Sequence, residues 1–230
     1  MSATQQHAAH RPQTRHLPQT RPVLVLASAS PRRRELLWQL GVPHRVAAAD
    51  VREDALGEES AEACVQRLAI AKARKIWQAA AVAGASATAL LPVLGADTAV
   101  VIDGEILGKP ADRVAAMRML ARLSGRTHQV LTAVALIGPH GSAQRLSLSE
   151  VSFRALTEAE CAAYWASGEP RDKAGAYAIQ GLGAVFVSEL RGSYSGVVGL
   201  PLFETAALLD AAGVARWQLK RPGRGTGADA

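Results

Sequence analysis

The segment Ala27–Arg34 combines side chains that could bind phosphate. It holds two serines and a proline, followed by three consecutive arginines, Arg32–Arg34. Ser30 is a good helix N-cap and Pro31 suits the first helical position, so the arginines fall in the first turn of a predicted helix. Cations there oppose the positive end of the helix dipole unless an anion lies among them. Free backbone N–H groups, serine hydroxyls and guanidinium groups together favour a phosphate site over a solvated basic turn.

Asp97 and Lys109 are the next candidates for chemistry. Asp97 interrupts the apolar run 91–102, and a carboxylate inside a buried strand must be paired, ligate a cation or accept a raised pKa. It could bond to its own loop at a strand end, or it could equally mark where the strand opens into a cleft and act there as a base or metal ligand. Lys109 lies between a glycine and a proline, in a turn with little freedom. Such a lysine is either a fixed cation or simply solvated.

Two further positions could complete the site. Lys72 lies on the apolar face of a helix predicted over residues 60–83. A lysine there either packs its stem and extends its ammonium to water or directs the ammonium into a cleft, and the sequence leaves both open. In the segment 174–181, alanines and glycines surround Tyr177 and Gln180, so the backbone can approach a ligand closely. The alternative for that segment is a packed loop whose glycines only serve turns.

These segments together predict a particular chemistry. Phosphate-binding cations, a carboxylate suited to a divalent metal and a rim of small residues favour metal-assisted attack on a nucleotide phosphate. The chain has no Gx₄GK[ST] pattern, which argues against a P-loop NTPase. Its six histidines form no metal set, because three of them lie before residue 20.

The elements that must position these residues alternate along the chain. Apolar runs predict strands at 23–26, 44–48 and 91–102, a hairpin turn at 103–104, and an antiparallel pair at 128–137 and 145–153. Capping residues predict helices at 31–40, 60–83, 112–123, 157–167 and 201–212. A glycine-rich segment from 168 to 199 contains a strand-like run at 184–190. This order predicts a mixed α/β fold.

The net charge of +6 is concentrated at the two ends of the chain. Residues 1–22 and 215–230 each carry +3, whereas the 19 basic and 19 acidic residues between them balance. We therefore expect no nucleic-acid partner. No run approaches the roughly 18 apolar residues of a membrane span, and the polar first residues do not resemble a secretory signal. Cys64 and Cys161 form neither a disulfide framework nor a metal-ligand spacing, which favours the reducing cytoplasm.

Several of these segments resemble the Maf family of nucleoside triphosphate pyrophosphatases, historically called septum-formation inhibitors. The motifs that carry the resemblance are Ser28–Arg33, Gly95–Thr98, Gly108–Pro110, Asp172–Tyr177 with Ile179–Gly181, and Ser193–Tyr194 with Val198–Pro201. The resemblance implies a mixed α/β fold of the Maf and inosine-triphosphatase type, with a long central mixed sheet flanked by helices and a cleft between two lobes. We accordingly expect a disordered extension at 1–22, a Maf-like domain at 23–213 and a basic, disordered tail at 214–230.

The resemblance also implies a role for each candidate residue. Asp97 would be the catalytic proton acceptor close to a divalent metal, Mg²⁺ or Mn²⁺, and Glu53 would assist at the metal. Many members carry a second acid beside the position of Glu53, where this chain has Arg52. The residues implied to hold the phosphates are Ser28, Arg32, Lys72 and Lys109. Those implied to select the base are Arg33, Thr98 and Gln180.

The implied reaction is hydrolysis of dTTP and UTP, with modified pyrimidine nucleotides as further substrates, to the monophosphate and pyrophosphate. Two alternatives stay open: the same chemistry on 7-methyl-GTP, and a nucleotide-binding regulator of cell division without turnover. Arg33 and Gln180 argue against the first, and an apparently buried Asp97 argues against a pure anion binder. Because members of the family are often dimers, a homodimer is expected.

Overall fold

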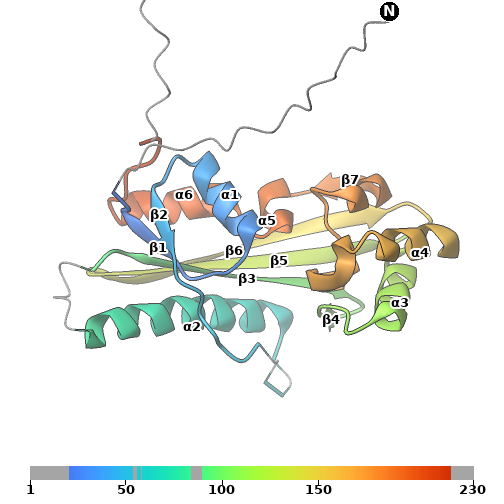
Figure 1. Ribbon diagram of the computed structural model, residues 1–230, viewed down its shortest axis with the longest axis horizontal. Helices are drawn as coiled ribbons and strands as arrows, with labels where there is room; N and C mark the ends of the chain where they lie inside the picture. The colour runs from blue at the N-terminus through green and yellow to red at the C-terminus, as the bar shows by residue number, and fades with distance from the viewer. Residues whose placement is uncertain (1–20, 54–55, 58, 84–89, 219–230) are drawn as a thin grey trace, which may run out of the picture.

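A seven-stranded mixed sheet forms the centre of the protein (Figure 1). The computed structural model describes residues 21–53, 56–57, 59–83 and 90–218. The strands follow the order β2-β1-β3-β5-β6-β7, and β4 pairs with β3 beside this path. Pairing is parallel between β1 and its neighbours β2 and β3, and antiparallel elsewhere. The strands are β1 Leu24–Leu26, β2 His44–Val46, β3 Val93–Ile102, β4 Glu105–Leu107, β5 Thr127–Gly138, β6 Gly141–Phe153 and β7 Val187–Arg191.

Helices cover both faces of the sheet. The longest, α2 (Ala61–Val82), packs against β3 and β5 on one face, whereas α1 (Pro31–Gln39), α5 (Tyr194–Val198) and α6 (Leu202–Ala211) lie on the other. Helices α3 (Arg113–Leu123) and α4 (Glu158–Ala166) pack together at one end. This arrangement confirms the expected mixed α/β class with helices on both sides of a long sheet.

Local signals account for where most helices begin. The side chains of Ser30, Ser60, Asp112 and Thr157 each accept a hydrogen bond from the backbone N–H three residues further on, as N-caps do. Thr157 and Glu160 also form a reciprocal capping box. The helices predicted after these four residues are therefore confirmed.

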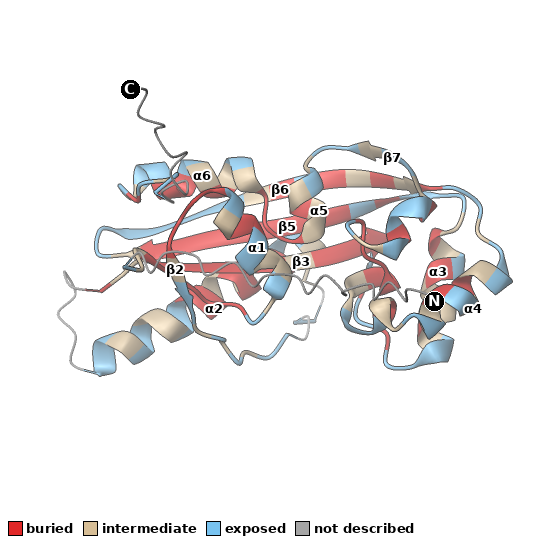
Figure 2. Cartoon of the chain, turned by 45° about the horizontal axis from the view of Figure 1, so that its top comes forward, coloured by how far each residue is buried: buried red, intermediate tan, exposed pale blue. Residues whose placement is uncertain are grey.

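The central strands are buried on both faces (Figure 2). Nine of the ten residues of β3 and eight consecutive residues of β5 are buried, as expected for strands covered by helices on both sides. A purely aliphatic cluster, including Leu24, Leu37, Leu94 and Leu208, fills the space under α1 and α6. A second cluster at the α3–α4 end contains His128, Tyr164 and Tyr177 among aromatic and aliphatic side chains.

The segment 168–199 differs most from its predicted form. Its strand-like run begins as the 3₁₀ turn Leu182–Phe186, and the strand β7 starts only at Val187. Two more 3₁₀ turns, Glu169–Asp172 and Ala174–Ala176, precede it, and α5 follows it. The expected disorder of the ends falls largely on residues 1–20 and 219–230, which lie outside the described residues, so it stays a prediction.

Candidate active site

A break in strand pairing opens a cleft along β3. Residues 93–94 of β3 pair with β1, and residues 100–102 pair with β4. Within the described residues, the stretch 95–99 between them pairs only with β5. A cleft of about 610 Å³ lies there, and it brings together every residue singled out from the sequence. These residues are Ser28, Arg32, Arg33, Glu53, Lys72, Asp97, Thr98, Lys109 and Gln180.

The cleft has two walls of different construction. We call Ser28–Arg33, Glu53, Lys72, Asp97 and Thr98 the charged wall, because they supply most of the ionised side chains. The opposite side consists of residues 172–180, which we call the loop wall. The two are joined through the Lys109 loop, where the Gly175 N–H donates to the Gly108 carbonyl at 3.1 Å.

The loop before α1 presents a polarised hydroxyl. Ser28 is buried, and its Oγ accepts hydrogen bonds from the Ser30 N–H and from Arg33 Nη1, both at 3.2 Å. A serine oxygen has two lone pairs, so both are engaged and the hydroxyl hydrogen is left to donate. Beside it, the N-terminal N–H groups of α1 provide partial positive charge. This end of the cleft is therefore suited to a phosphate oxygen.

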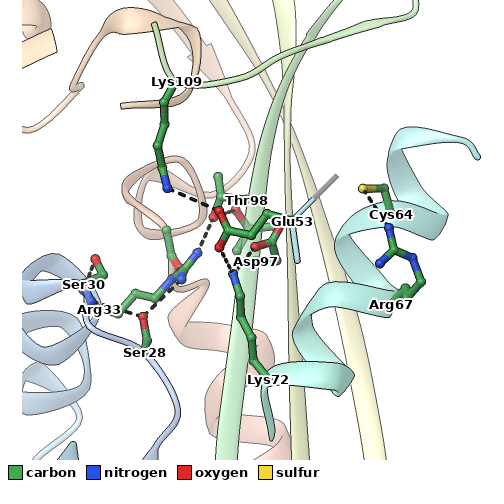
Figure 3. A network of polar contacts seen from close by, with 12 residues as sticks. Ser28, Ser30, Arg33, Glu53, Cys64, Arg67, Lys72, Asp97, Thr98 and Lys109 are labelled. Atoms are coloured by element: carbon green, nitrogen blue, oxygen red, sulfur yellow. Dashed lines mark hydrogen bonds and ion pairs between the residues drawn. The ribbon is translucent and has the colours of Figure 1, made fainter. Parts of the chain in front are cut away.

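Arg33 is fixed in place by three hydrogen bonds (Figure 3). Besides Ser28, it donates from Nε to the Gly199 carbonyl at 2.8 Å and from Nη2 to Thr98 Oγ1 at 3.1 Å. Burial lowers the pKa of Arg33; the Asp97 charge opposes this shift and the Arg32 charge adds to it. An arginine nevertheless stays charged in proteins, so Arg33 is a rigid, partly desolvated cation.

Lys72 directs its ammonium into the cleft, which answers the question that the sequence left open. Its Nζ lies 2.7 Å from Asp97 Oδ1 and 2.6 Å from Glu53 Oε1, and only 6% of the residue is exposed. Gly95 makes this possible, because a Cβ at that position would lie 2.2 Å from the Ala69 carbonyl oxygen of α2. The helix thus approaches β3 closely enough for Lys72 to reach the carboxylate.

Glu53 forms ion pairs with two lysines. Its Oε1 contacts Lys72, and its Oε2 lies 3.3 Å from Nζ of Lys109, whose side chain is 60% exposed. Burial pushes the pKa of Glu53 upward, but the hydrogen bonds and charges of the two lysines outweigh it, and the pKa is lowered overall. Glu53 is therefore ionised at neutral pH beside Asp97.

The donor set is compatible with a divalent cation. Asp97 and Glu53 present carboxylate oxygens around a single point, where Lys72 Nζ now lies. The described residues contain no cluster of three or more acidic, histidine or cysteine side chains around one point. Mg²⁺ is commonly held by one or two carboxylates together with substrate phosphates and water, so these two side chains fit such an ion bound with a nucleotide.

The loop wall carries less charge and more backbone. Asp172 contacts Lys173 and lies 3.6 Å from Arg32, which links the two walls across the cleft. Gly175 and Ala176 both adopt positive φ, at 67° and 58°. Behind them, Tyr177 is buried, and its hydroxyl lies 2.8 Å from His128 Nε2. This packing fixes the path of the segment that ends at Gln180.

Two contributors, Thr132 and Gly196, were not identified from the sequence, and Gly199 was named only as part of the motif Val198–Pro201. Thr132 is 1% exposed, and its hydroxyl contacts both Thr98 and the Gly196 carbonyl. Gly199 supplies the carbonyl that holds Arg33. The available signal was Thr132 itself, a polar residue inside the apolar run 130–137, but its partner segment is too short and glycine-rich to predict as a helix.

The sheet and the cleft together define a mixed α/β protein with a deep cleft lined by cationic side chains. The chain belongs to the Maf family, since a profile described as Maf-like protein matches residues 23–212. It is 53% identical over 199 residues to a dTTP/UTP pyrophosphatase of Saccharophagus degradans, covering 86% of this chain and 93% of that protein. It is 55% identical over 194 residues to a dTTP/UTP pyrophosphatase of Alkalilimnicola ehrlichii, covering 84% and 94%.

Among solved structures, similarity extends to the Staphylococcus aureus Ham1 protein. The likeness covers 56% of this chain and 71% of that one, at 16% identity and a TM-score of 0.36. Separately, none of the helices in the described part of the chain is long and apolar enough to cross a membrane.

Proposed function

We propose that this protein is a nucleoside triphosphate pyrophosphatase that hydrolyses dTTP and UTP to the monophosphate and pyrophosphate. Relatives named dTTP/UTP pyrophosphatase are 50–55% identical over most of the chain. The observation that carries the proposal is the buried Lys72 ammonium, which holds Asp97 and Glu53 together inside a cleft rimmed by cations. The proposal includes a cytoplasmic location and a homodimer, which fractionation and light scattering would test.

Asp97 is the proposed proton acceptor. Asp97 is 9% exposed, and one of its carboxylate oxygens is held by Lys72. A carboxylate held by an ammonium has a defined orientation, as a general base requires. We propose that Asp97 orients water for in-line attack on the α-phosphorus and takes its proton. Lys72 then serves both as a positioning group and as a phosphate ligand.

The remaining cations are proposed to hold the triphosphate. Ser28 donates its hydroxyl hydrogen, and Arg32 and Lys109 supply charge at the rim. Five cationic and three acidic side chains line the cleft, so it attracts an anion as a whole. Negative charge that builds on the departing pyrophosphate is stabilised by these fixed groups.

A divalent cation, Mg²⁺ or Mn²⁺, is part of the proposal. Asp97 and Glu53 would hold it, and when bound it would neutralise phosphate oxygens and polarise the phosphorus. Chelation should therefore abolish turnover, and either ion should restore it. Full turnover in excess chelator would remove the cation from the proposal without removing the reaction.

A hydrolysis panel tests the function directly. It compares dTTP, UTP, CTP, ATP, GTP and 7-methyl-GTP with Mg²⁺ and then Mn²⁺, and it resolves pyrophosphate from single phosphate. We expect pyrophosphate to be released fastest from dTTP and UTP. Preference for 7-methyl-GTP would retain the reaction and contradict the base assignment. Single phosphate would contradict attack at the α-phosphorus, and tight binding without turnover would favour a regulatory binder.

A further inference from the structure

Thr98 and Thr132 form a cross-strand pair beneath Arg33. They are opposite each other in the β3–β5 register, and their hydroxyl oxygens lie 3.0 Å apart. Thr98 is half-buried and lines the cleft, whereas Thr132 lies behind it with 1% exposure. Thr132 is thus in contact with a proposed base-selecting residue without lining the cleft itself.

The partners around this pair fix where the hydroxyl hydrogens point. The Thr132 hydroxyl lies 2.7 Å from the Gly196 carbonyl oxygen, which can only accept. Thr132 has one hydrogen, so it donates to Gly196, because two oxygens at that distance without a hydrogen would repel. The 3.0 Å contact between the two threonines must then carry the Thr98 hydrogen toward Thr132. Thr98 Oγ1 in turn accepts from Arg33 Nη2.

This direction leaves Thr98 as an acceptor toward the cleft. Its hydrogen is committed to Thr132, and one of its two lone pairs accepts from Arg33, so one lone pair is left for a ligand. Arg33 uses three of its five N–H groups on Ser28, Thr98 and Gly199, which leaves two to donate. Toward the cleft, Thr98 and Arg33 therefore offer one acceptor and two neighbouring donors.

Uracil and thymine match this pattern, and cytosine does not. Both carry an N3–H donor flanked by carbonyl oxygens, whereas cytosine has an N3 acceptor beside an amino donor. Gln180 cannot make this distinction alone, because its amide both donates and accepts and can flip. Two acceptors that face each other in a buried site cost free energy. Discrimination between uracil and cytosine therefore resides in Thr98, whose hydrogen is committed to Thr132, and in Arg33.

We infer that Thr132 is a specificity-determining positioning residue, which sets the Thr98 hydroxyl to accept from the N3–H of uracil or thymine. The inference rests on the proposed function and adds how the base is recognised. Without the Thr132 hydroxyl, the Thr98 hydrogen is free to turn toward the cleft and donate to N3 of cytosine. The isosteric variant Thr132→Val removes that hydroxyl and keeps the shape of the side chain.

The test measures kcat/KM for UTP and CTP by pyrophosphate release. In Thr132→Val we expect the UTP/CTP ratio to fall at least tenfold, about 1.4 kcal/mol, whereas Thr132→Ser should keep it within about threefold. Thr205→Val is the matched control, since it removes a fully buried hydroxyl that has no partner among the described residues. General loosening of the cleft would lower both rates and leave the ratio unchanged.

The outcomes separate the role of Thr132 from the proposed function of the protein. An unchanged ratio in folded Thr132→Val overturns the role of Thr132 and leaves the function intact. No pyrophosphate from UTP with the wild-type protein overturns the function and this inference with it. Should Thr132→Val fail to fold, N3-methyl-UTP with the wild-type protein serves instead. Turnover equal to that of UTP would overturn the inference, and at least a tenfold loss is expected.

Discussion

The two walls of the cleft are built from different kinds of structure. The charged wall rests on regular elements: β1 and α1 over an aliphatic cluster, and α2 against β3. The loop wall rests on 3₁₀ turns over an aromatic cluster that includes buried polar groups. One wall places its ionised groups on strands and helices, except for Glu53 on the irregular segment after β2, and the other shapes a backbone around them.

This difference indicates that the two walls have different roles. A charge must be held within a fraction of an ångström to act in catalysis, and helices and strands hold it best. The surface that completes the cleft needs shape more than charge, and a small-residue loop supplies it. Substitutions in the charged wall should therefore abolish chemistry, whereas those behind the loop wall should change stability first.

The largest expected effect is that of Asp97→Asn in the charged wall. The amide cannot accept the proton from water, so we expect turnover to fall by about 10³-fold, within the range for loss of a general base. The thermal midpoint should stay close to wild type, because Glu53 still pairs with Lys72. Asp103→Asn, at the exposed turn after the same strand, should keep its activity. Near-normal turnover in Asp97→Asn would remove it as the base.

Sequence reasoning succeeded where local signals determine the structure. Ser30 and Pro31 define the start of α1, and the apolar run around Asp97 defines a buried strand, so the elements that carry Arg32, Arg33 and Asp97 could be predicted. The direction of Lys72 could not be, because it depends on the close approach of α2 at Gly95, a long-range contact. The loop wall was harder still, since positive φ at a non-glycine residue such as Ala176 has no sequence signature.

His128 behind the loop wall should make stability depend on pH. Burial lowers the pKa of His128 to about 4, below the ordinary value of 6.5. The unfolded state therefore binds the proton first as pH falls, and stability is lost between pH 6.5 and about 4. The corresponding loss of unfolding free energy is on the order of 3 kcal/mol. Urea unfolding of the wild type and His128→Gln at several pH values checks it.

Comparing how the unfolding free energy of the two proteins depends on pH isolates the contribution of His128. Other ionisable groups titrate in both proteins, so the wild type should lose more stability than His128→Gln across that pH range. Parallel curves would show that His128 does not remain neutral in its site between Tyr177 and Phe153. Activity at pH 7.5 should change little in the variant, because the charged wall is intact.

Gly95→Ala tests whether the charged wall depends on the close approach of α2. The added Cβ meets backbone atoms of Ala69 and Ala73, which cannot move without shifting the helix. We expect a loss of about 1–3 kcal/mol in unfolding free energy, as for overpacked cores, and lower turnover because Lys72 moves with α2. Gly138→Ala, whose Cβ would meet only ordinary contacts, is the control. Equal stability of both variants would contradict the argument.

The smallest expected effect is that of Glu169→Gln, in the 3₁₀ turn that leads into the loop wall. The Glu169 carboxylate accepts hydrogen bonds from the Tyr164 hydroxyl at 2.7 Å and from the backbone N–H groups of Leu182 and Gly183 at 2.9 and 3.1 Å. Burial raises the pKa of Glu169, but these hydrogen bonds outweigh it and lower the pKa overall. Its stabilisation is therefore complete above the unfolded-state pKa and is lost as pH falls through the lower folded value.

Glutamine keeps the shape of the side chain but replaces one acceptor oxygen with a donor. One of the three donors then faces the side-chain N–H group of the glutamine. We therefore expect the unfolding free energy, measured in urea at pH 7, to fall by about 1–2 kcal/mol. The difference from wild type should shrink in acid, because protonated Glu169 also presents a donor. Glu189→Gln, at an exposed ion pair with Arg191, should change stability by less than about 0.5 kcal/mol. Should kcat fall as steeply as in Asp97→Asn, the two walls would not divide chemistry from shape.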